Sequence, residues 1–276
     1  MTLLRIEQYP PQPPRAEASQ AYQQVVNALS YGIDGIDVAY GDDIYQHIAL
    51  FVPETPNGSV LAFIHGGRWS YGYKESAAFM APAFNSAGVT LASIGHRLYP
   101  HRYDAGFADV SRAIAWLVNN ISDHGGDAQR IFVSGHSSGG HYAAQLAVTR
   151  NWQAREGVSR DVIRGCLPIS GVYDLTPAGW QGEERPPCLP DDDEGRVESP
   201  VHRLQETPPP FLITWGSDDY PFLIQQGKAF ANAVGDAGGE AKTLELPDKT
   251  HFTVHYEGAA ANGDWTERAL AWIAAH

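Results

Sequence analysis

From about residue 36 onward, short apolar runs alternate with segments of helical periodicity. The fully apolar run at 60–64 is typical of a buried strand, and the run at 47–53 of a half-buried one. Four further runs follow the same pattern, at 89–94, 131–133, 165–169 and 211–214. Helical segments lie between or after these runs, at 107–117, 138–149, 223–234 and 265–275. Strands that alternate with helices predict an α/β fold, a mostly parallel sheet covered on both faces.

The domain organisation is predicted from the length of the chain and the positions of its prolines. A chain of 276 residues suffices for one large domain, and no repeat or linker divides it. Four prolines within 10–14 exclude a helix there, so we expect residues 1–20 to form an irregular arm and residues 21–276 a single domain. Residues 175–204 are rich in Pro, Gly and acidic side chains, including the run 191–194. We expect a lid insertion there, although a solvated acidic loop is the plainer interpretation.

The charge balance excludes several classes of partner. Lys and Arg number 19 against 32 Asp and Glu, a formal net charge of -13. This negative charge disfavours contact with phosphate backbones and anionic lipids, so we expect neither nucleic acid nor membrane as a partner. The N-terminus lacks the plan of a signal peptide, and no window approaches 18 apolar residues. We therefore expect a cytoplasmic protein with a small-molecule substrate, and a homodimer remains open.

The two cysteines support the same expectation of a cytoplasmic location. Cys166 and Cys188 cannot build a disulfide scaffold, which indicates a reducing environment. Cys166 lies in an apolar run and is predicted to be a core residue. Cys188 lies in the irregular segment, where we expect an exposed thiol.

One motif lies at the junction between a predicted strand and a predicted helix. The sequence Gly-His-Ser-Ser-Gly at 135–139 directly follows the run at 131–133. A serine flanked by glycines on such a turn is typical of a nucleophile elbow, in which the sharp bend exposes the hydroxyl. The first amides of the following helix favour negative charge at the same point. Ser137 is therefore the predicted nucleophile.

A serine hydroxyl needs a base, and the base needs an acid to hold its tautomer. His251 follows the last apolar run and is the candidate base, with His255 as the alternative. Asp219 lies three residues past a glycine at the end of the preceding apolar run and is the candidate acid, with Asp218 as the alternative. The order Ser, Asp, His along the chain is that of hydrolases with a nucleophile elbow.

A glycine-containing loop follows the apolar run at 60–64. The sequence Ile-His-Gly-Gly-Arg-Trp at 64–69 lets backbone N–H groups approach a substrate carbonyl without obstruction by side chains. We expect an oxyanion hole made of the N–H groups of Gly67, Arg68 and Ser138. His65 is predicted to orient the loop through a side-chain hydrogen bond.

Other polar residues have plainer interpretations. Asp174, a third candidate acid, is predicted to cap the turn at 174–177. Several histidines lie near the predicted motifs but lack the spacing of metal ligands: His96, His101, His136 and His141. A dinucleotide fingerprint is also absent. We expect no metal and no cofactor.

Aromatic side chains near the motifs predict a flat pocket for an aryl group, although each could equally belong to the core. They are Trp69, Tyr71, Tyr173, Trp180, Trp215 and Tyr220. The selected substrate-binding candidates are Trp69, Tyr173 and Arg68. The Arg68 guanidinium either turns into the pocket, where it could pair with a substrate carboxylate, or faces solvent.

Several of these motifs occur together in one known family. They are the loop at 65–69, the elbow with Gly140 and His141 after it, and Ser-Gly-Val-Tyr-Asp-Leu-Thr-Pro at 170–177. Together they resemble the kynurenine formamidases (arylformamidases) and their bacterial carboxylesterase relatives, over about residues 36–255. The resemblance implies an α/β-hydrolase fold and a triad of Ser137, Asp219 and His251.

The resemblance also implies cleavage of an N-formyl arylamine through an acyl-enzyme. Two further possibilities stay open. One is a carboxylesterase that acts on short-chain acyl or aryl esters with the same residues. The other is a non-catalytic ligand-binding protein on the same fold. Arg68 and Ser138 depart from the residues more common in the family, which affects the expected substrate more than the reaction type.

Overall fold

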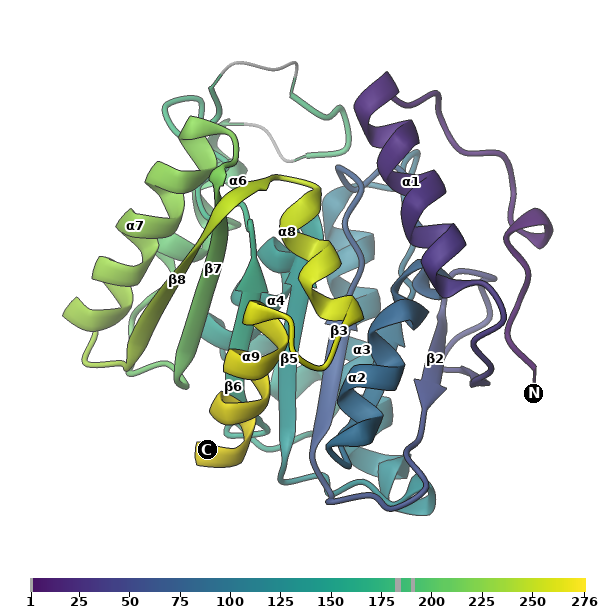
Figure 1. The fold of residues 1–276 in the computed structure, drawn as a ribbon. Helices are drawn as coiled ribbons and strands as arrows, with labels where there is room; N and C mark the ends of the chain where they lie inside the picture. The colour runs from purple at the N-terminus through teal and green to yellow at the C-terminus, as the bar shows by residue number, and fades with distance from the viewer. Residues whose placement is uncertain (1, 182–184, 190–191) are drawn as a thin grey trace.

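The computed structural model describes residues 2–181, 185–189 and 192–276, which contain one eight-stranded sheet with helices on both faces (Figure 1). The strands are β1 (Ile36–Ala39), β2 (His47–Phe51), β3 (Val60–Ile64), β4 (Thr90–Ile94), β5 (Ile131–His136), β6 (Ile163–Ile169), β7 (Phe211–Asp218) and β8 (Ala241–Thr250). The α-helices are α1 (Glu17–Ser30), α2 (Ala81–Ser86), α3 (Tyr103–Asn120), α4 (Ser138–Val148), α5 (Asn151–Glu156), α6 (Asp192–Val197), α7 (Pro221–Asp236), α8 (Thr253–Tyr256) and α9 (Asp264–Ala275). Short 3₁₀ helices lie at Ile6–Gln8, Lys74–Met80, Ile121–His124, Pro200–His202 and Glu257–Ala259.

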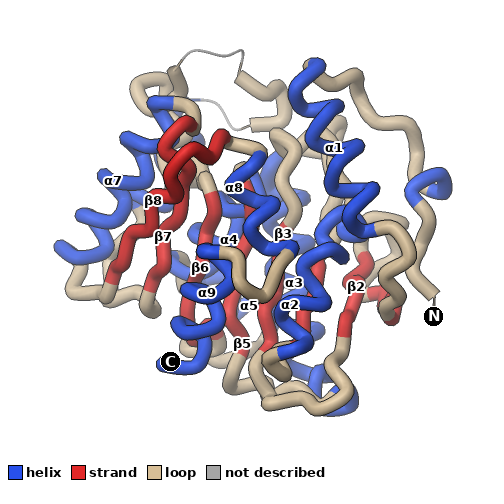
Figure 2. The backbone as a smooth tube through the Cα atoms, in the orientation of Figure 1, coloured by secondary structure: helices blue, strands red, loops and turns tan. Residues whose placement is uncertain are grey.

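The strands are arranged in the order β1-β2-β4-β3-β5-β6-β7-β8. β2 pairs antiparallel with both β1 and β4, and every other neighbouring pair is parallel. Figure 2 shows the strands side by side in one layer, with helices in front of it and behind it. The mostly parallel sheet predicted from the alternating pattern is therefore confirmed.

The core lies on both faces of this sheet. Along β3, Val60, Ala62 and Ile64 pack into a cluster with α3, α4 and α7. Leu61 and Phe63 point the other way, into a cluster with α2 and α9. Because alternate side chains of a strand point to opposite faces, a strand buried on both faces must be apolar throughout. This explains the uninterrupted apolar run at 60–64.

Two expectations about the first 53 residues need correction. The predicted strand at 47–53 ends at Phe51, and its residues 48–51 are buried rather than half-buried, because β2 lies between β1 and β4. The arm predicted to be irregular through residue 20 ends earlier, since α1 begins at Glu17. The prolines block a helix only as far as Pro14, and beyond them Val26 anchors an amphipathic helix in the core.

The segment 175–204 is only partly described. Residues 182–184 and 190–191 lie outside the described residues, and with them Asp191, where the predicted acidic run begins. The lid therefore stays a prediction. Cys188, expected to be exposed, is 2% exposed. Its backbone O accepts a hydrogen bond from Tyr103 N at 2.9 Å, and its Sγ lies 3.9 Å from the backbone O of Trp69. Cys188 therefore packs against the core. Cys166 is a core residue, as predicted.

None of the helices in the described part of the chain combines the length and the apolar character that a membrane crossing requires.

Candidate active site

Ser137 lies on the sharp turn between β5 and α4. Its φ of 56° and ψ of -120° form a combination that a residue with a side chain rarely adopts. The turn requires glycine at its ends, because a Cβ at Gly139 would lie 2.0 Å from Ile64 O, and a Cβ at Gly135 would lie 2.5 Å from the backbone of Gly139. The predicted nucleophile elbow is therefore present, pressed against the carboxyl end of β3.

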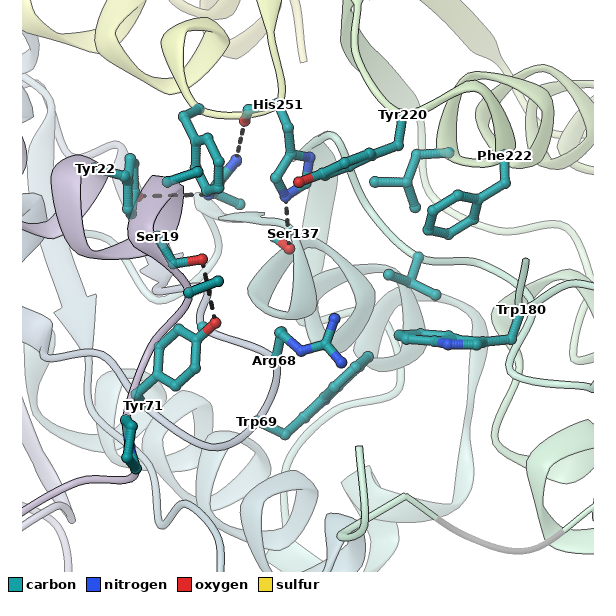
Figure 3. Close-up of a pocket in the computed structure, with 18 residues that line it drawn as sticks. Ser19, Tyr22, Arg68, Trp69, Tyr71, Ser137, Trp180, Tyr220, Phe222 and His251 are labelled. Atoms are coloured by element: carbon teal, nitrogen blue, oxygen red, sulfur yellow. Dashed lines mark hydrogen bonds between the residues drawn. The ribbon is translucent and has the colours of Figure 1, made fainter. Parts of the chain in front are cut away.

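His251 follows β8 and lies directly beside this serine. Its Nε2 is 3.0 Å from Ser137 Oγ, and its Nδ1 is 2.9 Å from Asp219 Oδ1. Figure 3 shows the imidazole directly above Ser137, with the hydrogen bond drawn. The serine O–H can donate to Nε2 while Nδ1–H donates to the carboxylate. Side chains from three distant parts of the chain thus form one continuous chain of hydrogen bonds.

The carboxylate of Asp219 is held from several directions and is only 5% exposed. Besides His251, its Oδ1 accepts a hydrogen bond from Tyr220 N at 2.7 Å, and its Oδ2 accepts one from Ser170 Oγ. These hydrogen bonds hold the carboxylate in one orientation, toward His251. The neighbouring Asp218 is exposed and accepts only a long 3.4 Å hydrogen bond from Ser217 Oγ. Of the two adjacent aspartates, the structure brings Asp219 to the histidine.

The second candidate base and the third candidate acid lie elsewhere. His255 is buried, and its Nδ1 is 2.7 Å from Tyr22 Oη rather than beside Ser137. Burial lowers the pKa of His255 to about 3, so its ring is neutral. Asp174 Oδ1 accepts a hydrogen bond from Thr176 N at 2.9 Å, which is the turn cap predicted for it.

The glycine-containing loop after β3 is tightly curled. Gly67, Arg68 and Trp69 have φ values of 128°, 55° and 56°. A Cβ at Gly67 would lie 1.8 Å from the backbone O of Tyr71, so the curl requires glycine there. Trp69 N donates to Ser138 Oγ at 3.4 Å, which ties the loop to the elbow. The serine that replaces the family's more common alanine therefore has a contact of its own.

This loop borders the predicted oxyanion hole. Gly67 and Arg68 line the cavity that contains Ser137. Ser138 is the first residue of α4, so its N–H is one of the four helix amides without an intrahelical partner. His65 Nδ1–H donates to Gly66 O at 2.9 Å, as predicted. Burial lowers the pKa of His65 well below its ordinary value, which leaves a neutral ring.

A cavity of about 520 Å³ opens in front of Ser137 (Figure 3). Phe, Tyr and Trp side chains form a large part of its wall. Its rings are Tyr22, Trp69, Tyr71, Trp180, Tyr220, Phe222 and Phe252. Four of the six aromatic residues singled out in the sequence are among them. Tyr173 and Trp215 are not: Tyr173 is buried against Phe230 with ring centroids 4.4 Å apart, and Trp215 is buried beside Glu245. Tyr173, expected to bind substrate, therefore does not line the cavity in front of Ser137.

One wall of the cavity comes from a part of the chain that carried no predicted site residue. Ala18, Ser19 and Tyr22 of α1 line it, and Ser19 Oγ accepts a 3.4 Å hydrogen bond from Tyr71 Oη. Tyr22 and Val26 lie four residues apart on one helix face, and this spacing was the feature of the sequence that could have predicted the helix. The expectation of an irregular arm obscured it.

Arg68 lies in this cavity rather than facing only solvent. Figure 3 shows its guanidinium between Ser137 and Trp180, and its Cζ lies 5.9 Å from the Trp180 ring centroid. Among the described lining residues there is no Asp or Glu. The described part of the wall therefore combines aromatic rings with the guanidinium of Arg68. The described residues contain no group of three or more His, Cys, Asp or Glu placed to hold a metal ion.

Known proteins are similar to this chain in sequence and in fold. Residues 48–177 match the family described as BD-FAE. "Esterase LipQ" of Mycobacterium tuberculosis is 33% identical over 70% of this chain and 49% of its own length. "Probable isoprenylcysteine alpha-carbonyl methylesterase ICMEL1" of Arabidopsis thaliana is 27% identical over 82% of this chain and 52% of its own length. The chain thus spans about half the length of these two relatives.

Other relatives are matched over most of their length. "Kynurenine formamidase" of Salmo salar is 25% identical over 87% of this chain and 85% of its own. The solved structure "Apo form of Thermogutta terrifontis esterase 2" superposes with a TM-score of 0.76 at 22% identity, over 87% of this chain and 94% of the other. The chain therefore has the fold of the solved α/β-hydrolase esterases, and its sequence is similar to those of carboxylesterases and of a kynurenine formamidase.

Proposed function

We propose that this protein is a serine hydrolase that forms an acyl-enzyme on Ser137. The observation that carries the proposal is the row of hydrogen bonds from Ser137 Oγ to His251 (3.0 Å) and from His251 to Asp219 (2.9 Å). This arrangement lets the imidazole remove the serine proton and lets the carboxylate stabilise the resulting imidazolium. The nearby loop and helix terminus supply N–H groups for the developing oxyanion.

The reaction proceeds in two halves. Ser137 Oγ attacks the substrate carbonyl carbon while its proton passes to His251 Nε2. The tetrahedral oxyanion accepts hydrogen bonds from the N–H groups of Gly67, Arg68 and Ser138. His251 then gives its proton to the leaving amine or alcohol, and the acyl group stays on the serine. Water, deprotonated by His251, repeats the attack and releases the acid.

For the substrate we propose an N-formyl arylamine. The aromatic wall of the cavity is suited to a flat aryl group, which offset or edge-on ring contacts would hold. The similarity to the kynurenine formamidase of Salmo salar, which extends over 85% of that protein, supports the same substrate class.

A carboxylesterase acting on short-chain or aryl esters is the second candidate. It is supported by the relatives and solved structures named as esterases, one of which is described as butyrate-bound. An ester and an amide would use the same hydrogen-bonded row. The two candidates differ in the acyl group and in the leaving group that the cavity accepts.

Parallel assays with N-formylkynurenine and 4-nitrophenyl acetate separate the candidates. Deformylation with a kcat/KM at or above that for the ester supports the formamidase, and ester turnover without any deformylation excludes it. A fluorophosphonate probe tests the chemistry common to both. We expect it to label the wild type and not Ser137→Ala. A folded wild type that stays unlabelled and inactive would instead support a non-catalytic ligand-binding protein.

A further inference from the structure

We propose that His136 is a positioning residue for His251 and that Tyr22 of the N-terminal helix α1 holds His136 in the orientation this requires. The inference rests on the proposed function, because the placement of His251 matters only if it acts as the base. It goes beyond that function by assigning a role to the residue before the nucleophile and to a helix that supplies none of Ser137, Asp219 and His251.

The first step is a contact between the elbow and the backbone of the base. His136 Nε2 lies 2.7 Å from the backbone O of His251. A carbonyl oxygen only accepts hydrogen bonds, so Nε2 must carry a hydrogen. His136 is 2% exposed, and burial together with His251 and His255 lowers its pKa well below the ordinary value. A neutral ring protonated on Nε2 has a bare Nδ1 that can only accept.

The second step brings in α1. The Tyr22 hydroxyl lies 3.5 Å from that His136 Nδ1 and 2.7 Å from His255 Nδ1. A hydroxyl has one hydrogen, so if Tyr22 donates to His136 it accepts from His255 Nδ1–H. His255 Nε2 is then a bare acceptor, and this atom is buried without a hydrogen-bond partner. An unpaired acceptor is tolerated more often than an unpaired N–H, which favours this direction.

Every hydrogen bond in the row therefore points the same way. His255 N–H donates to Tyr22, Tyr22 O–H donates to His136, and His136 N–H donates to His251 O. Hydrogen bonds in such a row polarise and strengthen one another. Ring packing supports the geometry: His136 stacks on His255 with centroids 5.0 Å apart and planes 5° from parallel, and its centroid is 4.8 Å from that of His251.

The consequence is mechanical. His251 directly follows the last residue of β8, so its backbone lies outside the paired part of the strand. His136 is covalently attached to Ser137, and its hydrogen bond fixes the base to the same elbow that carries the nucleophile. Figure 3 shows Tyr22 and Trp180 on opposite sides of Ser137, so α1 supports the base from the side away from Trp180. A displacement of about 1 Å at such a contact typically costs about 100-fold in rate.

The test compares two substitutions of His136 whose side chains have similar size. Gln and Met have side chains of similar length, and only Gln offers an N–H at about the reach of His136 Nε2. We expect His136→Met to lower kcat toward 4-nitrophenyl acetate by about 100-fold, with little change in KM. His136→Gln should recover at least about tenfold of that loss, because its amide can donate to His251 O. A purely structural role would not separate Gln from Met in kcat while leaving KM alone.

A second variant tests the contribution of α1. Tyr22→Phe removes only the hydroxyl, and we expect kcat to fall about threefold to tenfold with an unchanged cavity. Tyr256→Phe is the matched control, since its ring stacks on Tyr22 with centroids 5.9 Å apart but it does not line the cavity. That control should keep the wild-type kcat.

Three results would overturn the inference. They are a wild-type kcat in His136→Met, equal kcat values in His136→Met and His136→Gln, and an unaltered kcat in Tyr22→Phe. If circular dichroism shows that His136→Met does not fold, Tyr22→Phe alone decides. Failure of the proposed function would look different: Ser137→Ala would keep the wild-type activity, or the wild type would be inactive, and the inference would fall with it.

Discussion

At the scale of single residues, hydrogen-bond partners decide which of two similar side chains can do chemistry. Asp218 and Asp219 are adjacent and identical, yet one is exposed and the other is buried with three donors around it. Asp218 is the last residue of β7, whereas Asp219 lies in the turn that follows, and only Asp219 contacts His251. The same reasoning separates His251 from His255.

The aspartate pair gives a matched experiment. Asp219→Asn keeps the shape but removes the charge and disturbs the tautomer of His251, so we expect kcat to fall by about 10⁴-fold. Asp218→Asn should leave kcat unchanged, because Asp218 does not contact the histidine. Steady-state kinetics with 4-nitrophenyl acetate measure both. Comparable losses in the two variants would contradict the assignment of Asp219.

Arg68 should determine the preference for charged substrates. A charge-assisted hydrogen bond from its guanidinium to a substrate carboxylate is worth enough to change kcat/KM by about 10- to 100-fold. We therefore expect Arg68→Met to lower kcat/KM for mono-4-nitrophenyl succinate by that factor and to leave 4-nitrophenyl butyrate nearly unaffected. Equal effects on both esters would show that Arg68 acts on the loop backbone instead.

At the scale of elements, a buried ionic cluster fastens the N-terminal segment to the sheet. Lys74 is fully buried, and its Nζ contacts Asp37, Glu75 and the hydroxyl of Tyr9. Tyr9 belongs to the segment before α1, and Asp37 lies on the edge strand β1. Burial and the nearby Glu75 raise the pKa of Tyr9, so its hydroxyl stays protonated and donates to the carboxylate. Beyond this cluster the segment leads into α1, which walls the cavity.

Removing the cation should therefore destabilise the protein strongly. Lys74→Met removes the cation that two buried carboxylates share, and we expect a loss of about 3–5 kcal/mol in the free energy of unfolding. Lys242→Met is the control, because Lys242 is exposed and lies 3.9 Å from an exposed Glu240, an arrangement worth at most about 1 kcal/mol. Urea unfolding measures both. A Lys74→Met variant as stable as the control would contradict the structural role of the cluster.

The close approach of α4 to β3 gives a second stability prediction. Gly139→Ala would place a methyl group 2.0 Å from Ile64 O, where only backbone can move, so we expect a loss of about 3 kcal/mol or failure to fold. Gly235 lies in α7, and a methyl group added there would have no neighbouring atom within 4 Å. Gly235→Ala should instead stabilise the helix by about 0.5–1 kcal/mol. Thermal unfolding should shift in opposite directions in the two variants.

At the scale of the whole molecule, buried neutral histidines make folding sensitive to acid. Burial lowers the pKa of five histidines among the described residues, to about 3 in the case of His141 and His255. The other three are His65, His96 and His136. In the unfolded chain these rings take up a proton near pH 6.5. Below that pH the unfolded state binds more protons than the folded state, so stability falls as the pH falls.

We expect each of these histidines to cost about 1.4 kcal/mol per pH unit below about pH 6, a loss that continues down to the folded pKa. Urea unfolding at pH 8, 6 and 5 measures the slope. His141→Gln should make that slope smaller by about 1.4 kcal/mol per pH unit, because it removes one buried neutral ring. A free energy of unfolding that stays level from pH 8 to pH 5 would contradict the buried neutral state.

Local patterns determined the layered fold, the elbow at Ser137 and the choice of His251. An apolar run, a glycine pair and the spacing of one helix face are properties of a few neighbouring residues, so they can be read along the chain. The order Ser, Asp, His adds a constraint from topology, because the carboxyl ends of parallel strands meet at one edge. The fold class and the elbow could be predicted because each depends on residues that are neighbours in the sequence.

Only the tertiary structure decided which distant residues meet. The docking of α1 put Tyr22 beside His136, the packing against Trp69 buried Cys188, and the stacking on Phe230 kept Tyr173 out of the cavity. Each of these contacts joins segments far apart in sequence, and side-chain type alone does not specify its partner. The physical reason is that burial and hydrogen bonding at such positions depend on how whole elements pack, which no single window of the chain encodes.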